Sequence, residues 1–430
     1  MIKLIEALNF RCLRYVSQPL GPFHVLVGPN ASGKTTFLDV IAFLGRFVSD
    51  GLEAAIYERT QNFEDLTWGR RSGGFELAIE AAIPEDRRAL LEDKDYDTIR
   101  YEVAFGMDSL WKEIIIKAEK VVLRKIAHRE KITQGVLFPS MQVIPTTIIS
   151  SRKSKFEQTI VNKDSNGIDH FFSEIYFESG KRFFSSSYIG PGSALVFRLG
   201  PRKSALGNLP EDESMFPVTT WFKNFLNEGV QKFILNSLLI RKASPPGQVR
   251  GFKPDGSNLP WVIYNLQQKH PGNFRDWINH IQTALPDIEN IKTIERSDDK
   301  HRYLVICYRG GLEVPSWMAS DGTLLLLALT LPAYLPDLTG VFLIEEPENG
   351  IHPRAVETIY QSLSSVYNAQ ILLATHSPVI LSMVNAENVL CFAKTPKGET
   401  DIIRGTDHPN LKNWRGEINL GDLFAAGVLG

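Results

Sequence analysis

The chain has 430 residues, more than one hydrophobic core usually serves, so we expect two domains or one domain with a large insertion. Its content of 43% hydrophobic and 22% charged residues is typical of a folded protein and argues against a disordered tail or linker. With 47 basic and 49 acidic residues, the net charge of −2 neither favours nor excludes a polyanionic partner.

Two strands and a helix are predicted near the start of the chain. Residues 2–10 alternate apolar and polar side chains, residues 23–27 form a short apolar run, and a helical pattern extends over residues 34–47. Between the second strand and the helix stands Gly28-Pro-Asn-Ala-Ser-Gly-Lys-Thr35, a complete P-loop in the context that this motif requires. The pattern therefore predicts a site for ATP or another nucleoside triphosphate.

The residue types of the P-loop each have a chemical role. Gly28 and Gly33 permit backbone angles that point N–H groups inward, and the dipole of the following helix adds to the phosphate site. Lys34 is expected to reach the β- and γ-phosphates, and Thr35 to offer its hydroxyl to Mg²⁺. The other loop positions that we expect to contact the nucleotide are Asn30, Ser32 and Thr36.

The middle of the chain differs in charge from its two ends. Residues 111–260 contain about 22 Lys and Arg against about 13 Asp and Glu, which leaves the rest of the chain net acidic. Basic segments such as Arg152-Lys-Ser-Lys155 are interleaved with aromatic residues, a mixture that suits a nucleic-acid backbone and its bases. Solvated strand faces over an aromatic core produce the same pattern. No heptad pattern persists in this region, so we expect a compact lobe there.

Residues 317–323, Trp-Met-Ala-Ser-Asp-Gly-Thr, precede the most apolar run of the chain, residues 323–335. Ser320 and Gly322 at a helix start supply hydroxyl and N–H groups suited to a γ-phosphate, although the same residues also serve as a plain helix cap. The apolar run is too short to span a bilayer and predicts a buried helix.

Two buried strands are predicted over residues 341–344 and 371–374, with a helix over residues 353–366 between them. The first strand ends in Glu345, expected in the Mg²⁺ shell, and Glu346, expected to orient and deprotonate the attacking water. His376 follows the second strand, where it would touch the γ-phosphate. Alone, such carboxylates are also typical of a solvated strand end, and a lone histidine is usually a packed or surface residue.

Strands alternate with helices at both ends of the chain, which predicts an α/β fold with a parallel sheet flanked by helices. We expect the amino-terminal half of this domain in residues 1–110, a basic α+β insertion in residues 111–260 and the carboxyl-terminal half in residues 261–430. The three cysteines lack disulfide or zinc spacing, and residues 1–14 do not form a signal peptide. These features predict a cytoplasmic protein without a membrane partner.

Four motifs together resemble the Walker A, signature, Walker B and switch-histidine motifs of ABC-type ATPases, whose central sheet is mixed or parallel. In chain order they are Gly28 to Thr35, Ser320 to Thr323, Phe342 to Glu346 and Thr375 to Pro378. Within that superfamily the chain resembles the RecF-like and SMC-related branch that includes the overcoming-lysogenization-defect (OLD) ATPases. The phrases that carry this resemblance are Asn9-Phe-Arg-Cys12, Pro254-Asp-Gly-Ser-Asn-Leu-Pro260, Ser320-Asp-Gly-Thr323 and Glu345-Glu-Pro-Glu-Asn-Gly-Ile-His-Pro353.

The resemblance implies a homodimer in which Ser320 and Gly322 of one copy close on the ATP held by Lys34 and Thr35 of the other. It implies an ATPase that switches with its nucleotide, senses DNA or RNA or controls an effector, and serves a bacterial antiphage or DNA-maintenance system. A Toprim-type nuclease is the expected partner. The alternative is a scaffold that ATP stabilises, with little turnover. A transport ATPase is disfavoured, because the signature lacks a double glycine.

The chain departs from the pattern of these relatives at several positions. Their Walker B aspartate is Glu345 here, one methylene longer, so we expect slow hydrolysis. The resemblance also implies a glutamine that completes the metal shell before the insertion, and Gln61 is the candidate, although nothing near it in the sequence fixes its orientation. Arg11 is expected to approach the nucleotide phosphates, with a surface arginine as the alternative. The 54 residues after His376 lack an acidic nuclease cluster, so we expect any cutting to come from a partner.

Overall fold

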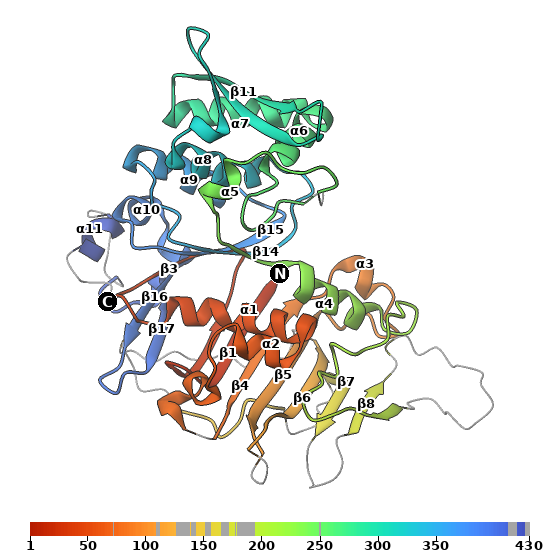
Figure 1. The fold of residues 1–430 in the computed structure, drawn as a ribbon. Helices are drawn as coiled ribbons and strands as arrows, with labels where there is room; N and C mark the ends of the chain where they lie inside the picture. The colour runs from red at the N-terminus through yellow and green to blue at the C-terminus, as the bar shows by residue number, and fades with distance from the viewer. Residues whose placement is uncertain are drawn as a thin grey trace.

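The computed structural model describes residues 1–71, 73–108, 112–125, 138, 143–150, 156–164, 172–176, 178, 194–248, 251–411 and 419–425. In these parts the chain forms three β-sheets and the helices that cover them (Figure 1). A six-stranded sheet lies in the middle of the molecule. An eight-stranded antiparallel sheet lies in the lobe drawn below it, and a helical lobe with a three-stranded sheet lies above it.

The central sheet has the strand order β10-β14-β15-β3-β16-β17, and all neighbours are parallel except β16 and β17. Its strands are β3 (Phe23–Val27), β10 (Val230–Phe233), β14 (Gly340–Glu345), β15 (Ala369–Ala374), β16 (Val389–Lys394) and β17 (Thr400–Arg404). β3 and β15 are buried along their whole length, because other elements cover both faces of the sheet. The predicted mixed central sheet flanked by helices is confirmed.

The eight-stranded sheet has the order β2-β1-β4-β5-β6-β7-β8-β9. Its strands are β1 (Ile2–Phe10), β2 (Leu13–Pro19), β4 (Phe75–Ala82), β5 (Thr98–Met107), β6 (Ile114–Arg124), β7 (Glu157–Asp164), β8 (Phe172–Tyr176) and β9 (Ala194–Arg198). The sequence did not predict β2, which forms a hairpin with β1 at the sheet edge. Only Leu13 and Val16 of this strand are buried apolar residues, so its pattern is weak.

Helix α1 (Lys34–Asp50) is enclosed between the two large sheets. Its side chains Phe37, Phe43 and Phe47 are fully buried in a core to which both sheets contribute. Phe43 meets Phe75 of β4 and Phe105 of β5 edge-on, with ring centroids 5.6 and 5.4 Å apart. Because truncating such a ring costs roughly 3–5 kcal/mol, this packing fixes α1 and the P-loop in front of it.

The opposite face of the central sheet has a second core. Its helices are α6 (Leu259–Lys269), α7 (Pro271–Ala284), α8 (Asp321–Thr330), α9 (Pro353–Ser364) and α10 (Pro378–Met383), and its small sheet consists of β11 (Ile288–Glu295), β12 (Arg302–Tyr308) and β13 (Glu313–Pro315). The helix predicted over residues 323–335 begins earlier, at Asp321, and gives way to a 3₁₀ turn, η5 (Leu331–Tyr334). Pro332 explains the change, because proline cannot donate the next helical hydrogen bond.

Five further α-helices lie in the described parts of the chain. They are α2 (Leu52–Tyr57), α3 (Glu85–Arg88), α4 (Pro217–Glu228), α5 (Ser237–Ile240) and α11 (Leu420–Ala425). Among the described residues, no helix has both the length and the apolar character of a membrane span.

The change in charge at residue 111 does not coincide with a break in the fold. β5 and β6 pair on either side of it, with Met107 opposite Ile114, and both belong to the sheet that begins with β1. Residue 260, the other expected boundary, lies inside α6. The basic region therefore extends the amino-terminal sheet by several strands, since strand pairing joins it to residues 1–107. A division into independent domains at these positions stays a prediction.

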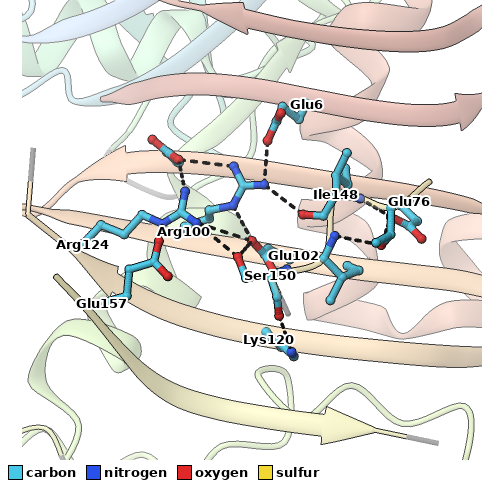
Figure 2. A network of polar contacts seen from close by, with 12 residues as sticks. Glu6, Glu76, Arg100, Glu102, Lys120, Arg124, Ile148, Ser150 and Glu157 are labelled. Carbon is cyan, nitrogen blue, oxygen red and sulfur yellow. Dashed lines mark hydrogen bonds and ion pairs between the residues drawn. The ribbon is translucent and has the colours of Figure 1, made fainter. Parts of the chain in front are cut away.

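Arg100 of β5 is held by three carboxylates within the eight-stranded sheet (Figure 2). Its guanidinium nitrogens lie 2.6 Å from Glu6, 3.2 Å from Glu80 and 2.5 Å from Glu102. The same network holds residues 143–150 on the sheet, because Arg100 donates to the carbonyl of Ile148 at 3.2 Å and Glu102 accepts from the amide of Ser150 at 2.7 Å. These charged groups act beside one apolar contact, that of Ile148 with Leu8 and Ala78, so the attachment of the segment depends strongly on complete pairing of the charges.

Candidate functional site

A cavity of about 540 Å³ opens where the P-loop meets the carboxyl ends of β14 and β15. Such an edge of a parallel sheet is where α/β proteins place their ligands. Most predicted site residues meet there. The cavity is lined by Arg11, Cys12, Asn30, Ala31, Ser32, Gly33, Lys34, Thr35, Thr36, Asp65, Thr67, Gly69, Arg70, Glu345, Glu346, Ala374, His376 and Lys394.

The two P-loop glycines occupy positions that no other residue fits. Gly28 has φ 151°, and a Cβ there would lie 2.2 Å from the carbonyl oxygen of Phe392. Gly33 has φ 107°, and its Cβ would lie 2.4 Å from Oγ1 of Thr400. The loop therefore packs against β16 and β17, while α1 directs its free N–H groups toward the cavity, with no acidic residue in its first turn.

Lys34 is buried beneath the loop, with 7% of its surface exposed. Its Nζ donates to the carbonyl oxygens of Gly28 at 2.8 Å and Pro29 at 3.0 Å. Burial lowers the pKa of Lys34, whereas the carboxylates of Glu346 and Glu345 act in the opposite direction. These bonds hold the ammonium group beside the loop backbone at the wall of the cavity, where it can bind an anion.

Glu345, the last residue of β14, has two partners. One carboxylate oxygen accepts the hydroxyl hydrogen of Thr35, and the other lies 2.7 Å from Nζ of Lys232 on β10. Two hard oxygen donors, the Thr35 hydroxyl and the Glu345 carboxylate, are thus in contact. Donors of this kind suit Mg²⁺.

Glu346 has a strained backbone, with φ 48° in the left-handed region. Its N–H donates to the carbonyl of Ala374 at 2.8 Å, and its carboxylate accepts from Asn349 Nδ2 at 2.6 Å. The side chain is exposed and lines the cavity. The left-handed backbone conformation therefore turns the side chain of Glu346 away from the direction of β14 and toward the P-loop cavity.

His376 follows β15 and lies at the rim of the cavity. Burial lowers the pKa of His376, Lys34 lowers it further, and Glu346 and Glu348 oppose both effects. The ring is therefore mainly neutral at pH 7, in which state one ring nitrogen donates and the other accepts.

Backbone strain gathers at this cavity. Of the seven non-glycine residues with positive φ in the described parts of the chain, four line it: Arg11 (49°), Ala31 (60°), Arg70 (54°) and Glu346 (48°). Strain of this kind persists only where the surroundings impose it, and it concentrates at functional sites. Arg11 is also held by Asp39 of α1, with NH1 3.1 Å from the carboxylate.

A second cavity, of about 610 Å³, shares Asn30, Glu346 and His376 with the first. Its other walls come from the segment after β14 and the start of α9 and α10, among them Glu348, Asn349, Pro353, Val356 and Pro378. Glu346 and His376 therefore lie between the two cavities and can be contacted by a ligand bound in either one.

Four predicted site residues do not line the P-loop cavity: Gly28, which packs against β16 behind the loop, and Ser320, Gly322 and Gln61. Ser320 is exposed at the start of α8, where its Oγ accepts from the N–H of Thr323 at 3.1 Å, and it lines neither cavity. Gly322 packs on the loop after β14, because a Cβ there would lie 2.8 Å from the carbonyl oxygen of Gly350. Gln61 is exposed, and from the segment that follows it Asp65 and Arg70 line the cavity instead.

Sequence patterns missed other residues of the site. Glu348, which lines the second cavity, belongs to the motif after β14 but received no role. Asp65 and Arg70 lie in two short 3₁₀ helices, and Thr67 lies between these helices, where no motif indicates a site. Lys232 had no local signal, because its place depends on the pairing of β10 with β14.

The fold and the P-loop are those of the P-loop ATPase families of the AAA/ABC type. The chain belongs to the protein family described as "AAA domain, putative AbiEii toxin, Type IV TA system", which it matches over residues 23–138 and 191–382. It is 30% identical over 414 residues to the retron Vc95 probable ATPase of Vibrio cholerae serotype O1 biovar El Tor, a match that covers 90% of this chain and 72% of that protein.

Shorter similarities and a solved structure agree with this assignment. Over 41 residues the chain is 51% identical to the OLD nuclease of Thermus scotoductus, and this match covers 10% of this chain and 8% of that protein. Over 85 residues it is 41% identical to the DNA replication and repair protein RecF of Brucella abortus, 19% of each chain. An Smc head bound to the C-winged helix domain of ScpA has the same fold, with a TM-score of 0.50, 13% identity and coverage of 94% of this chain and 97% of that chain.

Proposed function

We propose that the protein binds and hydrolyses ATP at the P-loop cavity. The P-loop N–H groups and Lys34 bind the phosphates, and Glu346 orients the attacking water and accepts its proton. His376 contacts the γ-phosphate and holds it in line with that water. The observation that supports this reading is the convergence of Lys34, Thr35, Glu346 and His376 on one cavity.

Thr35 and Glu345 are the residues that would hold Mg²⁺, since their oxygens are in contact and of the type this ion prefers. When bound, the ion supplies positive charge that offsets the negative charge of the reacting phosphates. Gln61 is a further proposed residue of the metal shell. Because Gln61 is exposed and does not line the cavity, this role requires its segment to move when the nucleotide binds.

The active form that we propose is a head-to-tail homodimer. Ser320 and Gly322 line neither cavity of their own chain, and in this proposal a second copy supplies them to the nucleotide. Exposed apolar side chains stand near Ser320, with Met318 71%, Leu238 66% and Trp317 48% exposed. A cluster of this kind on a monomer supports a partner surface around the signature.

The relatives support a role for the ATP switch in a bacterial antiphage or DNA-maintenance system. They are named as a retron ATPase, an OLD nuclease and a DNA replication and repair protein. We propose that the dimer senses DNA or RNA or controls an effector such as a Toprim-type nuclease.

The basic segment proposed to hold nucleic acid consists of Arg152, Lys153 and Lys155, which lie outside the described residues. Neutralising them should weaken nucleic-acid binding and reduce its salt dependence, and salt-independent binding would count against this role.

A scaffold that ATP stabilises, with little turnover, is the second candidate. The observation in its favour is Glu345, which replaces the aspartate of related ATPases and pairs with Lys232. If ATP drives dimerisation while phosphate release stays negligible, this function replaces hydrolysis as the main role.

Mixing two inactive variants tests the shared site. Lys34→Ala removes the phosphate ligand, and Ser320→Arg blocks the signature, so each homodimer should be inactive. A mixed dimer contains one intact composite site, and we expect it to regain up to about half the turnover of one wild-type dimer. Light scattering or native mass spectrometry verifies that heterodimers form. Heterodimers without turnover would overturn the shared site.

A further inference from the structure

Lys232 contacts the carboxylate that is expected beside the metal. Its Nζ lies 2.7 Å from one oxygen of Glu345, while the other oxygen accepts the hydroxyl hydrogen of Thr35. Both oxygens of Glu345 are therefore engaged, one by a cation and one by the P-loop. None of the sequence motifs of the site includes Lys232.

Strand register explains how Lys232 reaches this place. β10 is the edge strand of the central sheet and pairs in parallel with β14, so that Lys232 lies beside Leu343. Leu343 and Glu345 are two residues apart and share one face of the sheet, the face whose core includes α1. Lys232 therefore lies on the same face as Thr35, and its long side chain extends along the strand to Glu345.

The ion pair is partly shielded from solvent. The side chain of Lys232 is 36% exposed and that of Glu345 23% exposed. Glutamate has one more rotatable bond than the aspartate of related ATPases, so a second partner beside Thr35 narrows the positions that its carboxylate samples. The ammonium limits that freedom, and it also places a positive charge where a divalent cation would bind.

We propose that Lys232 is a positioning residue of the metal site. It holds the longer carboxylate of Glu345 against Thr35, and its charge opposes divalent-cation binding until the nucleotide phosphates add their negative charge. This role rests on the proposed nucleotide site, and it makes Lys232 a residue that controls divalent-cation binding there.

Removing the lysine has two opposite effects on metal affinity. Loss of the tether lets Glu345 move and weakens binding, whereas loss of the positive charge strengthens it. In water-like surroundings a unit charge several ångströms away changes the affinity for a divalent ion by about tenfold. Thr35 still holds the other oxygen of Glu345, so the charge effect is the larger of the two.

Titration of Mn²⁺ by electron paramagnetic resonance, without nucleotide, tests the proposal. Lys232→Met should bind Mn²⁺ about tenfold more tightly than the wild type. Lys232→Arg, which keeps the charge, should stay within about twofold of the wild type. Lys292→Met removes a comparable ion pair, with Glu313 in the small sheet, and serves as the matched control without effect on Mn²⁺.

Equal Mn²⁺ binding by Lys232→Met and the wild type, including no binding by either, would overturn the role of Lys232. Glu345→Gln in the Lys232→Met background should abolish the gain, and a gain that persists would place the metal elsewhere. Binding of a fluorescent ATP analogue to the same proteins separates the two levels of inference. If the wild type does not bind the analogue, the proposed function fails, whatever the Mn²⁺ result.

Discussion

Glu348 accepts the hydroxyl hydrogen of Thr375 at 2.6 Å, and the same carboxylate oxygen accepts the N–H of His376 at 2.9 Å. These bonds tie the loop after β14 to the end of β15. Glu346 stands two residues before Glu348 in that loop, so the proposed base and the proposed γ-phosphate ligand are held in one unit. The orientation of His376 thus depends on a residue that lies outside the P-loop cavity lining.

Loss of this link should lower turnover without loss of ATP binding. Glu348→Ala leaves the Thr375 hydroxyl and the His376 N–H without their acceptor, and we expect kcat to fall about tenfold. Glu348→Gln keeps an amide oxygen as acceptor and should retain most of the activity. Steady-state phosphate release and equilibrium ATP binding measure the two effects. Equal activity of both variants and the wild type would show that the link has no part in turnover.

Glu346 should be required for hydrolysis and dispensable for binding. Glutamine has the same shape but cannot accept the proton of the attacking water, so Glu346→Gln should lower turnover by about a hundredfold or more. ATP binding should survive, because Lys34 and the loop N–H groups remain. Single-turnover hydrolysis and ATP binding by filter retention provide the measurements. Unchanged turnover would remove Glu346 from the role of base.

The sequence predicted the parts of the site that lie in continuous motifs. The P-loop, Glu345, Glu346 and His376 each follow a buried strand, and parallel strands bring their carboxyl ends to one edge, so their meeting could be expected. Glu345 was expected to act with Thr35, and the two side chains are in contact. Their catalytic and metal-binding roles stay predictions.

Residues whose place depends on distant pairing could not be predicted. Lys232 meets Glu345 only because β10 joins the sheet beside β14, and nothing near Lys232 in the sequence indicates this. The edge strand β2 has few buried apolar residues, and the pairing of β5 with β6 across residue 111 could not be predicted, because charge reports surface and not strand pairing. Ser320 and Gly322 were assigned by motif, and one chain alone does not bring them to the P-loop.

His24 should make the fold less stable in mild acid. Burial lowers the pKa of His24 from 6.5 to about 4, and the ring accepts the N–H of Gly21 at 2.7 Å. The unfolded chain takes up a proton below about pH 6.5 and the folded chain does not, so stability is present above that pH and is lost as pH falls toward 4. The loss amounts to about 3 kcal/mol.

His24→Gln, which keeps an acceptor and has no titrating group, should remove most of this pH dependence. The measurement is urea unfolding at pH 7.0 and 4.5, compared between the variant and the wild type. The difference between the two proteins isolates His24, since carboxylates titrate equally in both. Parallel losses of stability in the two proteins would contradict the assignment.

Arg100 should be needed both for the stability of the eight-stranded sheet and for the attachment of residues 143–150 to it. It is 4% exposed, and Glu80 and Glu102 beside it are 3% and 0% exposed. Arg100→Met leaves these carboxylates buried with less compensation, because Arg124 lies 2.7 Å from Glu80 but 3.9 Å from Glu102. We expect the free energy of unfolding to fall by about 3–5 kcal/mol, the usual cost of removing one partner from a buried ion pair.

The same change should release residues 143–150 before the sheet unfolds. Arg100 donates to the carbonyl of Ile148, and Glu102, which Arg100 orients, accepts from the amide and the hydroxyl of Ser150. Amide hydrogen exchange of this segment should therefore accelerate at denaturant concentrations where α1 stays protected. Lys292→Met, which breaks an exposed pair, should leave both exchange and unfolding unchanged. If Arg100→Met accelerated exchange equally in α1 and in residues 143–150, the network would act on the whole lobe and not on this segment.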